Sequence, residues 1–511
     1  MNKAFKSSLD AETANALLTT GLKSAMHMTL LGHPVSAASM AFVEAVADLL
    51  LTQEQGQRRD RGKQLPKFKA TISAIVIDLL NAAARRVIVP QISGVVVPEA
   101  LTYGWAYHGR HTEYFRNADH DVSKRLFADC IDDFERAGLL EREKGISFQS
   151  KLTGSDGKKY ETHKATRYRA TDALAKLAEA HGISSGGYRT HFKYDLPRTV
   201  IELREPSEWK DQPNGSRKKE KGKRIRLAPT PEVEALSQPI KELNAFLSAV
   251  KIEGGLHWAF RRIFNDGDKS KPAFNKGGRL YSSGPDSYQQ DSKETRRSIT
   301  FDGQPTCEID IRSSFLTLIY GLCRHHCLDE EGYSLGNPHE EDLYSLPDTE
   351  SRSVGKAWFT IAIGLHSMPV KWSAARVKDY REETGGNLKK YRVAEVAEKM
   401  LSKHPVIGYW LSQTDRNSKD LQFIESNIIL NTMLRLKRSY GIPALPVHDS
   451  LIVKTQDAEV AAGVLKAEFE CMADIIPCLS LSKGTSVGFE IDRVRPLRTQ
   501  EQEALLDAAN F

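Results

Sequence analysis

The sequence predicts an α+β protein in which a largely helical N-terminal region precedes an antiparallel sheet and further helices. Two strand-like apolar runs, residues 308–315 and 446–453, predict the sheet. The first run contains Asp310 and the second contains Asp449. Valine, isoleucine and leucine on both sides of Asp449 are typical of a hairpin that presents His448 and Asp449 at its tip. Apolar residues at helical spacing predict the helices, over the first 100 residues and again from about residue 232.

The bulk composition favours a chain of several packed domains. A length of 511 residues favours two to four domains, and 40% hydrophobic residues suffice for packed cores. A membrane-spanning helix requires a run of about 18 apolar residues, and the sequence contains no such run. The first residues lack the apolar core of a secretory signal, and six cysteines do not make a disulfide framework, so we expect a reducing cytoplasm. The net charge of +6 is mild, but the basic residues are clustered.

Residues 1–100 form the first predicted region, which is helical and shows no evident chemistry. Apolar residues recur at helical spacing from 17 to 26 and from 42 to 50. A polar, basic break at 55–63 predicts an exposed loop, and the apolar stretch 72–89 predicts a further helix.

Residues 101–205 have the order helix, short strand, polar loop, short strand, which is the outline of a winged-helix module. An apolar stripe from Val122 to Phe134 predicts the helix, which should end at Ala137 and Gly138. Such modules usually place a helix in the major groove of DNA and a basic wing on the backbone. The basic residues expected to contact phosphate are Lys151, Lys158, Lys159, Lys164, Arg167 and Arg169. The same outline occurs in protein-interaction modules, so both interpretations stay open.

Residues 206–231 are predicted as a basic, flexible linker. Seven lysines and arginines occupy ten positions between Arg217 and Arg226, and prolines and a glycine flank them. Two interpretations are equally compatible with this composition, an arm that follows phosphates and a solvated hinge. The remaining region, 232–511, contains the motifs that indicate chemistry.

The first of these motifs lies at residues 278–290, which read GRLYSSGPDSYQQ, and a second follows at 308–315. They resemble the GRLSS segment and motif A of family A DNA polymerases, with Tyr281 as an insertion. In that family the motif A aspartate binds both catalytic metal ions, which implies Asp310 and the adjacent Ile311 as metal ligands. The resemblance also implies that Arg279, Ser282 and Ser283 hold the primer-template.

The next motif is 352–364, RSVGKAWFTIAIG, which looks like motif B of the polymerase fingers. The i, i+4 spacing places Arg352 and Lys356 on one side of a helix, where both can grip a triphosphate. The residues of this motif are closer to those of the single-subunit phage-type RNA polymerases. Both families usually have a tyrosine immediately before the glycine, whereas this chain has Ile363, and Phe359 is the candidate substitute for that nucleotide contact.

The last motif is 446–453, where His448-Asp449-Ser450 is similar to motif C. The DNA enzymes usually read His-Asp-Glu there, and the phage-type RNA polymerases read His-Asp-Ser. The resemblance implies Asp449 as the second metal ligand and His448 as a contact of the primer-end phosphate. The ordered set of motifs predicts a right-hand polymerase palm with an antiparallel sheet and helical fingers.

These motifs imply a template-dependent nucleotidyltransferase that uses two Mg²⁺ ions, with Mn²⁺ able to replace them. Its expected partners are primer-template DNA and nucleoside triphosphates, and the sequence indicates no protein partner. No Asp-x-Glu motif of an exonuclease precedes the palm, so we expect no proofreading. A phage, plasmid or other mobile element is the expected source.

The sugar preference is not settled by the motifs. The family's DNA enzymes carry a glutamate five residues after the motif A aspartate, where this chain has Phe315. A bulky aromatic ring could exclude a 2′-hydroxyl, which favours dNTPs, whereas the wording of motifs B and C favours rNTPs. We prefer a DNA polymerase, with two alternatives: an RNA polymerase or primase on the same palm, or a non-enzymatic winged-helix DNA-binding regulator with a relic palm.

Some weaker candidates stand beside these motifs. Asp342 and Tyr344 resemble an Asp-x-His/Tyr element of the family that could contact the fingers, although a structural cap or a solvated face is the plainer interpretation. The same choice applies to Glu425 and Asn427, on a helix expected at 421–437, which could face the template or primer. Glu308 could support a metal or pair with a cation.

Cys323 and Cys327 invite a zinc interpretation. A zinc site needs two more ligands, and none stands at the usual spacing. We therefore favour a buried helix at this position.

Overall fold

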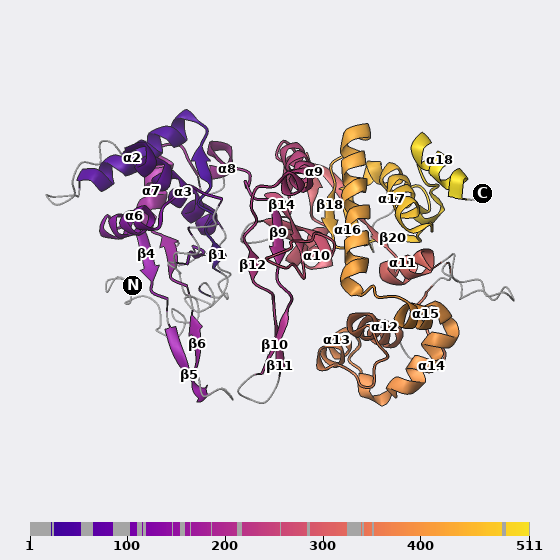
Figure 1. Cartoon of the computed structure of the whole chain (residues 1–511). Coiled ribbons are helices and arrows are strands. Elements are labelled where there is room, and N and C mark those ends of the chain that lie inside the picture. The colour runs from indigo at the N-terminus through magenta and orange to yellow at the C-terminus, as the bar shows by residue number, and fades with distance from the viewer. Residues whose placement is uncertain are drawn as a thin grey trace, which may run out of the picture. The chain divides into compact units, whose positions relative to one another are not determined.

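The computed structural model (Figure 1) contains two compact units, each with its own hydrophobic core. It describes residues 22, 25–52, 65–84, 103–109, 115, 119–145, 147–153, 159–163, 165–184, 187–211, 217–255, 257–283, 287–323, 339, 342–349, 352–482 and 487–509. The first unit comprises the chain up to Thr199 and residues 209–218 and 283–286. The second unit comprises the rest. None of the described helices combines the length and the hydropathy that a membrane span requires.

The first unit is built around a helix that is buried along most of its length, α3. Its elements are β1 (Met26–His27), β2 (Gly32–Pro34), α2 (Ala37–Thr52), α3 (Leu65–Ala84), β3 (Ala106–Tyr107), α6 (Lys124–Arg136), β4 (Leu140–Glu143), β5 (Ser147–Thr153), β6 (Lys159–His163), β7 (Arg167–Ala170), α7 (Asp172–Ala180), α8 (Tyr188–His191) and β8 (Phe192–Tyr194). The strands form three sheets, β1-β3-β7-β4, β2-β8 and β5-β6. Short strands pack around α3, which is buried on nearly every side between Thr71 and Ala83.

The helix and strands predicted in 101–205 are present in the expected order. Helix α6 buries Phe127, Cys130, Ile131 and Phe134 and ends at Ala137, and the next residue, Gly138, has a positive φ of 69°. Strand β4, the hairpin β5–β6 and strand β7 follow, and β7 pairs antiparallel with both β3 and β4. The predicted helix and its end are confirmed, whereas a DNA-binding role for these elements stays a prediction.

The linker predicted at 206–231 contains strands where the structure describes it, so that prediction is wrong. Strands β10 (Glu208–Asp211) and β11 (Arg217–Glu220) pair with each other. Strand β12 (Arg224–Ile225) pairs antiparallel with β9 (Ile201–Arg204). Ile225 is buried and lies opposite Leu203, so one apolar side chain anchors a segment whose composition is otherwise basic.

The second unit contains one mixed sheet, one antiparallel sheet and a group of helices. Its helices are α9 (Pro231–Leu247), α10 (Lys293–Arg296), α11 (Ser314–Leu322), α12 (Ser353–Leu365), α13 (Ala374–Thr384), α14 (Val393–Lys403), α15 (Pro405–Gln413), α16 (Ser418–Arg435), α17 (Ala458–Ala473) and α18 (Gln500–Ala509). Its further strands are β13 (Ile252–Glu253), β14 (Ala259–Phe264), β15 (Gly277–Ser283), β16 (Thr300–Phe301), β17 (Gln304–Ile311), β18 (Leu445–Val447), β19 (Ser450–Lys454) and β20 (Leu479–Leu481). One sheet has the order β12-β9-β14-β15; the other has the order β13-β16-β17-β19-β18, with β20 on the far side of β17.

The second of these sheets is covered by helices that place the candidate site. Helices α11 and α17 both pack against α16, which is the long orange helix beside the sheet in Figure 1. Helices α12 to α15 form a separate group, which meets the sheet's helices where α15 packs against α11. The described residues therefore have a sheet with its own helices and an attached helical group, as the predicted α+β class requires.

Candidate active site

The two aspartates singled out in the sequence lie on neighbouring strands. Strands β17 and β19 are antiparallel, Asp310 stands opposite Ser450, and the backbone N–H of Ile311 donates to the carbonyl of Asp449 at 3.3 Å. The β18–β19 hairpin has the two-residue loop His448-Asp449, and His448 adopts a φ of 58°. A positive φ at the first loop residue is the geometry that tight hairpins require.

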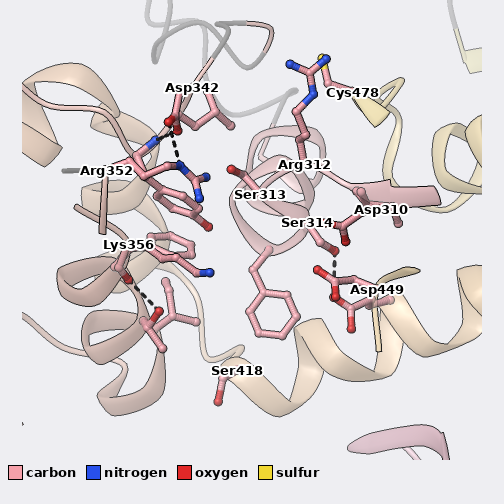
Figure 2. A pocket seen from close by; sticks show the side chains of 18 of the residues that line it. Asp310, Arg312, Ser313, Ser314, Asp342, Arg352, Lys356, Ser418, Asp449 and Cys478 are labelled. Atoms are coloured by element: carbon pink, nitrogen blue, oxygen red, sulfur yellow. Dashed lines mark hydrogen bonds and ion pairs between the residues drawn. The ribbon is translucent and has the colours of Figure 1, made fainter. Parts of the chain in front are cut away.

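Asp310 and Asp449 line a cavity of about 1050 Å³ (Figure 2). The pKa of Asp310 is raised to about 6, chiefly by burial and also by the charges of Asp449 and Glu308, while the charges of Lys293 and Lys356 oppose the rise. An ionised Asp310 is therefore costly unless a cation approaches it.

The donor chemistry of this pair fits a hard divalent cation. Carboxylate oxygens are the ligands that Mg²⁺ prefers, and Mg²⁺ is often held by only one or two carboxylates together with substrate phosphates and water. Within the described parts of the chain, no group of three or more His, Cys, Asp or Glu side chains gathers to hold a metal ion. Asp310 and Asp449 would thus act as a pair, with oxygens of the substrate to complete the coordination.

Glu308 lies on the same strand but does not belong to this pair. Its two carboxylate oxygens accept hydrogen bonds from Nε and Nη2 of Arg296, both at 3.1 Å, and Oε1 also accepts one from Ser450 Oγ at 2.7 Å. Of the two interpretations of Glu308, the structure supports pairing with a cation.

Helix α12 supplies the opposite side of the cavity. Its N-cap Arg352 and the helical residues Lys356, Phe359 and Ile363 all line it, at the i, i+4, i+7 and i+11 positions of one helix face. Figure 2 shows Arg352 and Lys356 on the side facing Asp310 and Asp449. Lys356 forms no ion pair with any described residue, so its ammonium group is available to an anion.

Arg352 is less available than Lys356. Its Nε donates to Oδ2 of Asp342 at 2.7 Å, and its guanidinium lies 5.4 Å from the ring centroid of Tyr344. Tyr344 in turn packs against Phe359, with ring centroids 5.6 Å apart. The pair Asp342 and Tyr344 thus orients Arg352 and backs the cavity wall.

The glycine within this helix has a physical reason. A Cβ at Gly355 would stand 2.3 Å from the carbonyl oxygen of Tyr344, so only glycine lets α12 approach that segment. The sequence indicated Tyr344 only weakly, because its role depends on the close approach of Gly355 and not on the residues next to it in the sequence.

Strand β15 brings Arg279 into the cavity. Gly277 and Gly278 precede it, with φ values of 75° and 76° that favour glycine. The guanidinium of Arg279 pairs with the carboxylate of Glu425 on α16 and lies 5.8 Å from the ring centroid of Phe315, which also lines the cavity.

Glu425, a weak candidate in the sequence, also lines the cavity. It is only 1% exposed, which excludes the solvated face expected for it. Burial raises its pKa, while the Arg279 guanidinium opposes that effect. Its neighbour Asn427 accepts a hydrogen bond from Arg262, so it is engaged within the protein.

Three other residues of the resemblance do not line the cavity: Ser282, Ser283 and His448. The hydroxyl of Ser282 lies 3.0 Å from Nδ1 of His257, and its N–H donates to Gln289. His448 is exposed at the hairpin tip. The contacts that these three residues are expected to make with the primer-template remain predictions, and such contacts would lie outside this cavity.

The basic residues predicted for a wing have a mixed outcome. Arg169 is buried, pairs with Glu141 and lies 4.7 Å from the Trp105 ring, so the expectation that it contacts phosphate is wrong. Arg167 donates from Nε to the carbonyl of Leu22 at 2.7 Å and from Nη1 to that of Ala165 at 2.9 Å, which engages two of its five N–H donors within the protein, so its contact with phosphate stays a prediction. Lys158 and Lys164 lie outside the described residues, and so do the side chains of Lys151 and Lys159.

The cysteine pair is tested only in part. Cys323 is buried directly after α11, which agrees with the buried helix favoured there. Cys327 lies outside the described residues.

The comparisons with known proteins find similarity among solved structures. No protein-family model matches the sequence, and no curated protein matches it. Among solved structures, the chain is similar to the POL domain of Pol1 from M. smegmatis in complex with DNA primer-template and dNTP, at 12% identity and a TM-score of 0.27. That similarity covers 92% of this chain and 69% of the other. A likeness this distant does not define the function, for which the residues of the cavity are the basis.

Proposed function

We propose that the second unit is a template-dependent nucleotidyltransferase, with a DNA polymerase as the preferred form. The observation that supports it is one cavity with a carboxylate pair, Asp310 and Asp449, on one side and the cations Arg352 and Lys356 on the other. A triphosphate needs cations for its phosphates and metal-binding carboxylates beside the reacting phosphorus. The cavity offers both.

In this proposal each residue positions one part of the reaction. Lys356 and Arg352 bind the triphosphate, and Arg279 steadies the primer-template. Asp310 and Asp449 would hold two Mg²⁺ ions, which when bound activate the attacking 3′-hydroxyl and neutralise charge on the pyrophosphate. Positioning and charge neutralisation supply most of the rate in phosphoryl transfer, so no covalent role of the protein is required.

Phe315 is the proposed determinant of sugar choice. It lines the cavity beside the Arg279 guanidinium, where its ring can crowd a 2′-hydroxyl. This position favours dNTPs. Synthesis of RNA, as by a polymerase or primase on the same palm, is the alternative that the wording of motifs B and C keeps open.

Primer extension tests the proposal directly. The purified chain receives Mg²⁺ and either dNTPs or rNTPs, on a primed DNA template, on an unprimed template and without template. We expect extension with dNTPs, and a loss of about 10³-fold or more in Asp310→Asn and in Asp449→Asn, since metal-assisted charge stabilisation amounts to several kcal/mol. Glu459→Gln, at an exposed position on α17, is the matched control and should leave activity unchanged.

Each other outcome has a defined meaning. Product from rNTPs alone would move the protein to RNA synthesis on the same carboxylates. Folded protein that binds DNA but makes no product with either nucleotide would overturn the enzyme and favour the non-enzymatic regulator. DNA binding by itself would not discriminate, because every one of these proteins binds DNA in a salt-dependent way.

A further inference from the structure

A buried carboxylate joins three elements at the wall of the cavity. Glu425 on α16 accepts a hydrogen bond from Arg279 Nε at 3.0 Å through Oε1 and one from Ser314 Oγ at 2.8 Å through Oε2. Arg279 belongs to β15 and Ser314 is the first residue of α11. Figure 2 shows Ser314 beside Asp310, with its hydrogen bond drawn as a dashed line. One side chain therefore connects the strand that carries the primer contact with the helix that carries Phe315.

The connection is strong because the carboxylate is almost fully removed from water. A buried carboxylate requires a cation or several donors, and here each oxygen has a donor from a different element. Removing Glu425 would leave the Arg279 guanidinium without its counter-charge and the Ser314 hydroxyl without its acceptor. Phe315 follows Ser314 directly in the sequence. Without Glu425, the Phe315 ring would lose the restraint that Ser314 provides at the start of α11 and the restraint that Arg279 provides beside the ring.

The strand itself is held by different residues. Arg262 Nε donates to the carbonyl of Gly278 at 2.8 Å, and its Nη2 donates to Asn427 Oδ1 on α16 at 2.5 Å. These contacts fix the backbone of β15 next to Arg279 without Glu425. A change at Glu425 should therefore free side chains at the cavity wall more than it displaces the strand.

We infer that Glu425 is a positioning residue for sugar selection, which holds Phe315 through Ser314 and holds Arg279 against the same ring. Glu425 touches no reacting atom in this scheme. Glu425 fixes the distance between the Phe315 ring and the sugar of the nucleotide, while Arg279 holds the primer. The inference rests on the proposed polymerase function and adds to it the residue on which sugar discrimination depends.

The test compares incorporation of dNTP and rNTP, as the ratio of their kcat/KM values, on one primed DNA template. We expect Glu425→Ala to lower this ratio by about tenfold or more, mainly through better use of rNTP, because a ring that is no longer held can move away from the 2′-hydroxyl, and steric rejection of one hydroxyl amounts to about 10²-fold. Glu425→Gln can still accept from Arg279 and donate to Ser314 Oγ, so it should restore most of the ratio. Ser314→Ala removes one of the two contacts and should have an effect of the same sign but smaller.

Asn427→Ala serves as the matched structural control, because it cuts the Arg262 contact on the same helix. It should lower thermal stability and both kcat/KM values together, with their ratio unchanged. If Glu425→Ala does not fold, Ser314→Ala decides.

The outcomes separate the inference from the proposed function. Active, folded Glu425→Ala and Ser314→Ala variants with the unsubstituted ratio would overturn the inference alone. An unsubstituted protein that incorporates both nucleotides equally would also overturn it. An unsubstituted protein that incorporates neither would overturn the proposed function and the inference together.

Discussion

Glu308 and Asp310 stand two residues apart on β17, yet their surroundings differ completely. Glu308 is 8% exposed and its charge is neutralised by the bidentate contact with Arg296. Asp310 faces the cavity and forms no ion pair with a described residue, and its pKa is raised to about 6. One carboxylate therefore serves the fold and the other is available to a cation.

This contrast predicts opposite effects of two amide substitutions. Glu308→Gln removes the counter-charge of a buried arginine, and we expect it to lower the free energy of unfolding by about 3–5 kcal/mol while the Mg²⁺ concentration for half-maximal activity stays the same. Asp310→Asn removes a carboxyl that burial disfavours, so it should preserve or raise stability without metal and abolish activity. Chemical denaturation and a Mg²⁺ titration of primer extension measure the two effects. A Glu308→Gln variant with full stability and an altered Mg²⁺ requirement would contradict this division.

At this scale the sequence predicts which residues carry chemistry better than it predicts their partners. Asp310 and Asp449 could be found because each stands in a local apolar run. Glu425 was only a weak candidate, and its burial and its partner could not be found, because Arg279 lies 146 positions away and only tertiary packing brings them together. Alternation along β17 placed Glu308 on a strand face, but the position of Arg296 decided its role.

Among the elements, α12 shows how closely a helix must pack to form the cavity. Gly355 lies against the carbonyl of Tyr344, whereas Gly364, near the other end of the same helix, has no atom within 4 Å of a Cβ placed on it. The two glycines thus differ in their surroundings while sharing one helix.

They form a matched pair of substitutions. Gly355→Ala should lower the thermal midpoint and weaken nucleotide binding, since a Cβ that meets backbone at 2.3 Å forces α12 away from Tyr344, at a cost of about 1–3 kcal/mol. Gly364→Ala should be neutral or stabilise by up to about 1 kcal/mol, because alanine has the higher helix propensity. Thermal unfolding monitored by circular dichroism measures both. Equal losses in the two variants would show that α12 does not depend on this contact.

The elements recovered from sequence are those with a long local pattern. Helix α6, helix α12 and the β18–β19 hairpin follow from apolar spacing and from turn or cap residues. Strands of two or three residues, such as β12 and β20, contain no periodic pattern, and only pairing with β9 or β17 defines them. The linker prediction failed for this reason: composition describes a segment's solubility but not its pairing.

At the scale of the whole molecule, the two cores hold their buried charges differently. In the second unit the raised carboxyl pKa values belong to the cavity. In the first unit Asp78, fully buried on α3, accepts hydrogen bonds from the N–H of Leu30 at 2.8 Å and from the hydroxyl of Tyr194 at 3.1 Å. Leu30 adopts a φ of 56°, an uncommon value that this contact helps to hold.

Asp78 gives the first unit a stability that depends on pH in a direction opposite to the usual one for carboxyl groups. Burial raises its pKa from 3.8 to about 7, so the folded state binds a proton that the unfolded state has already released between these values. Its contribution to stability is fully present below about pH 4 and is lost as pH rises towards 7, by an amount on the order of 4 kcal/mol. Hydrogen exchange of the α3 amides, corrected for the intrinsic rate at each pH, should therefore show decreasing protection between pH 4.5 and pH 7.5.

The Asp78→Asn variant provides the control, because an amide occupies the same volume and does not ionise. Its α3 protection should vary less over this range and should exceed that of the unsubstituted protein at the upper end. The Asp310→Asn variant, with the change in the other core, should leave the α3 profile as it is. An α3 profile that is flat in the unsubstituted protein, or that changes in Asp310→Asn instead of Asp78→Asn, would show that Asp78 is not the group that links the first unit's stability to pH.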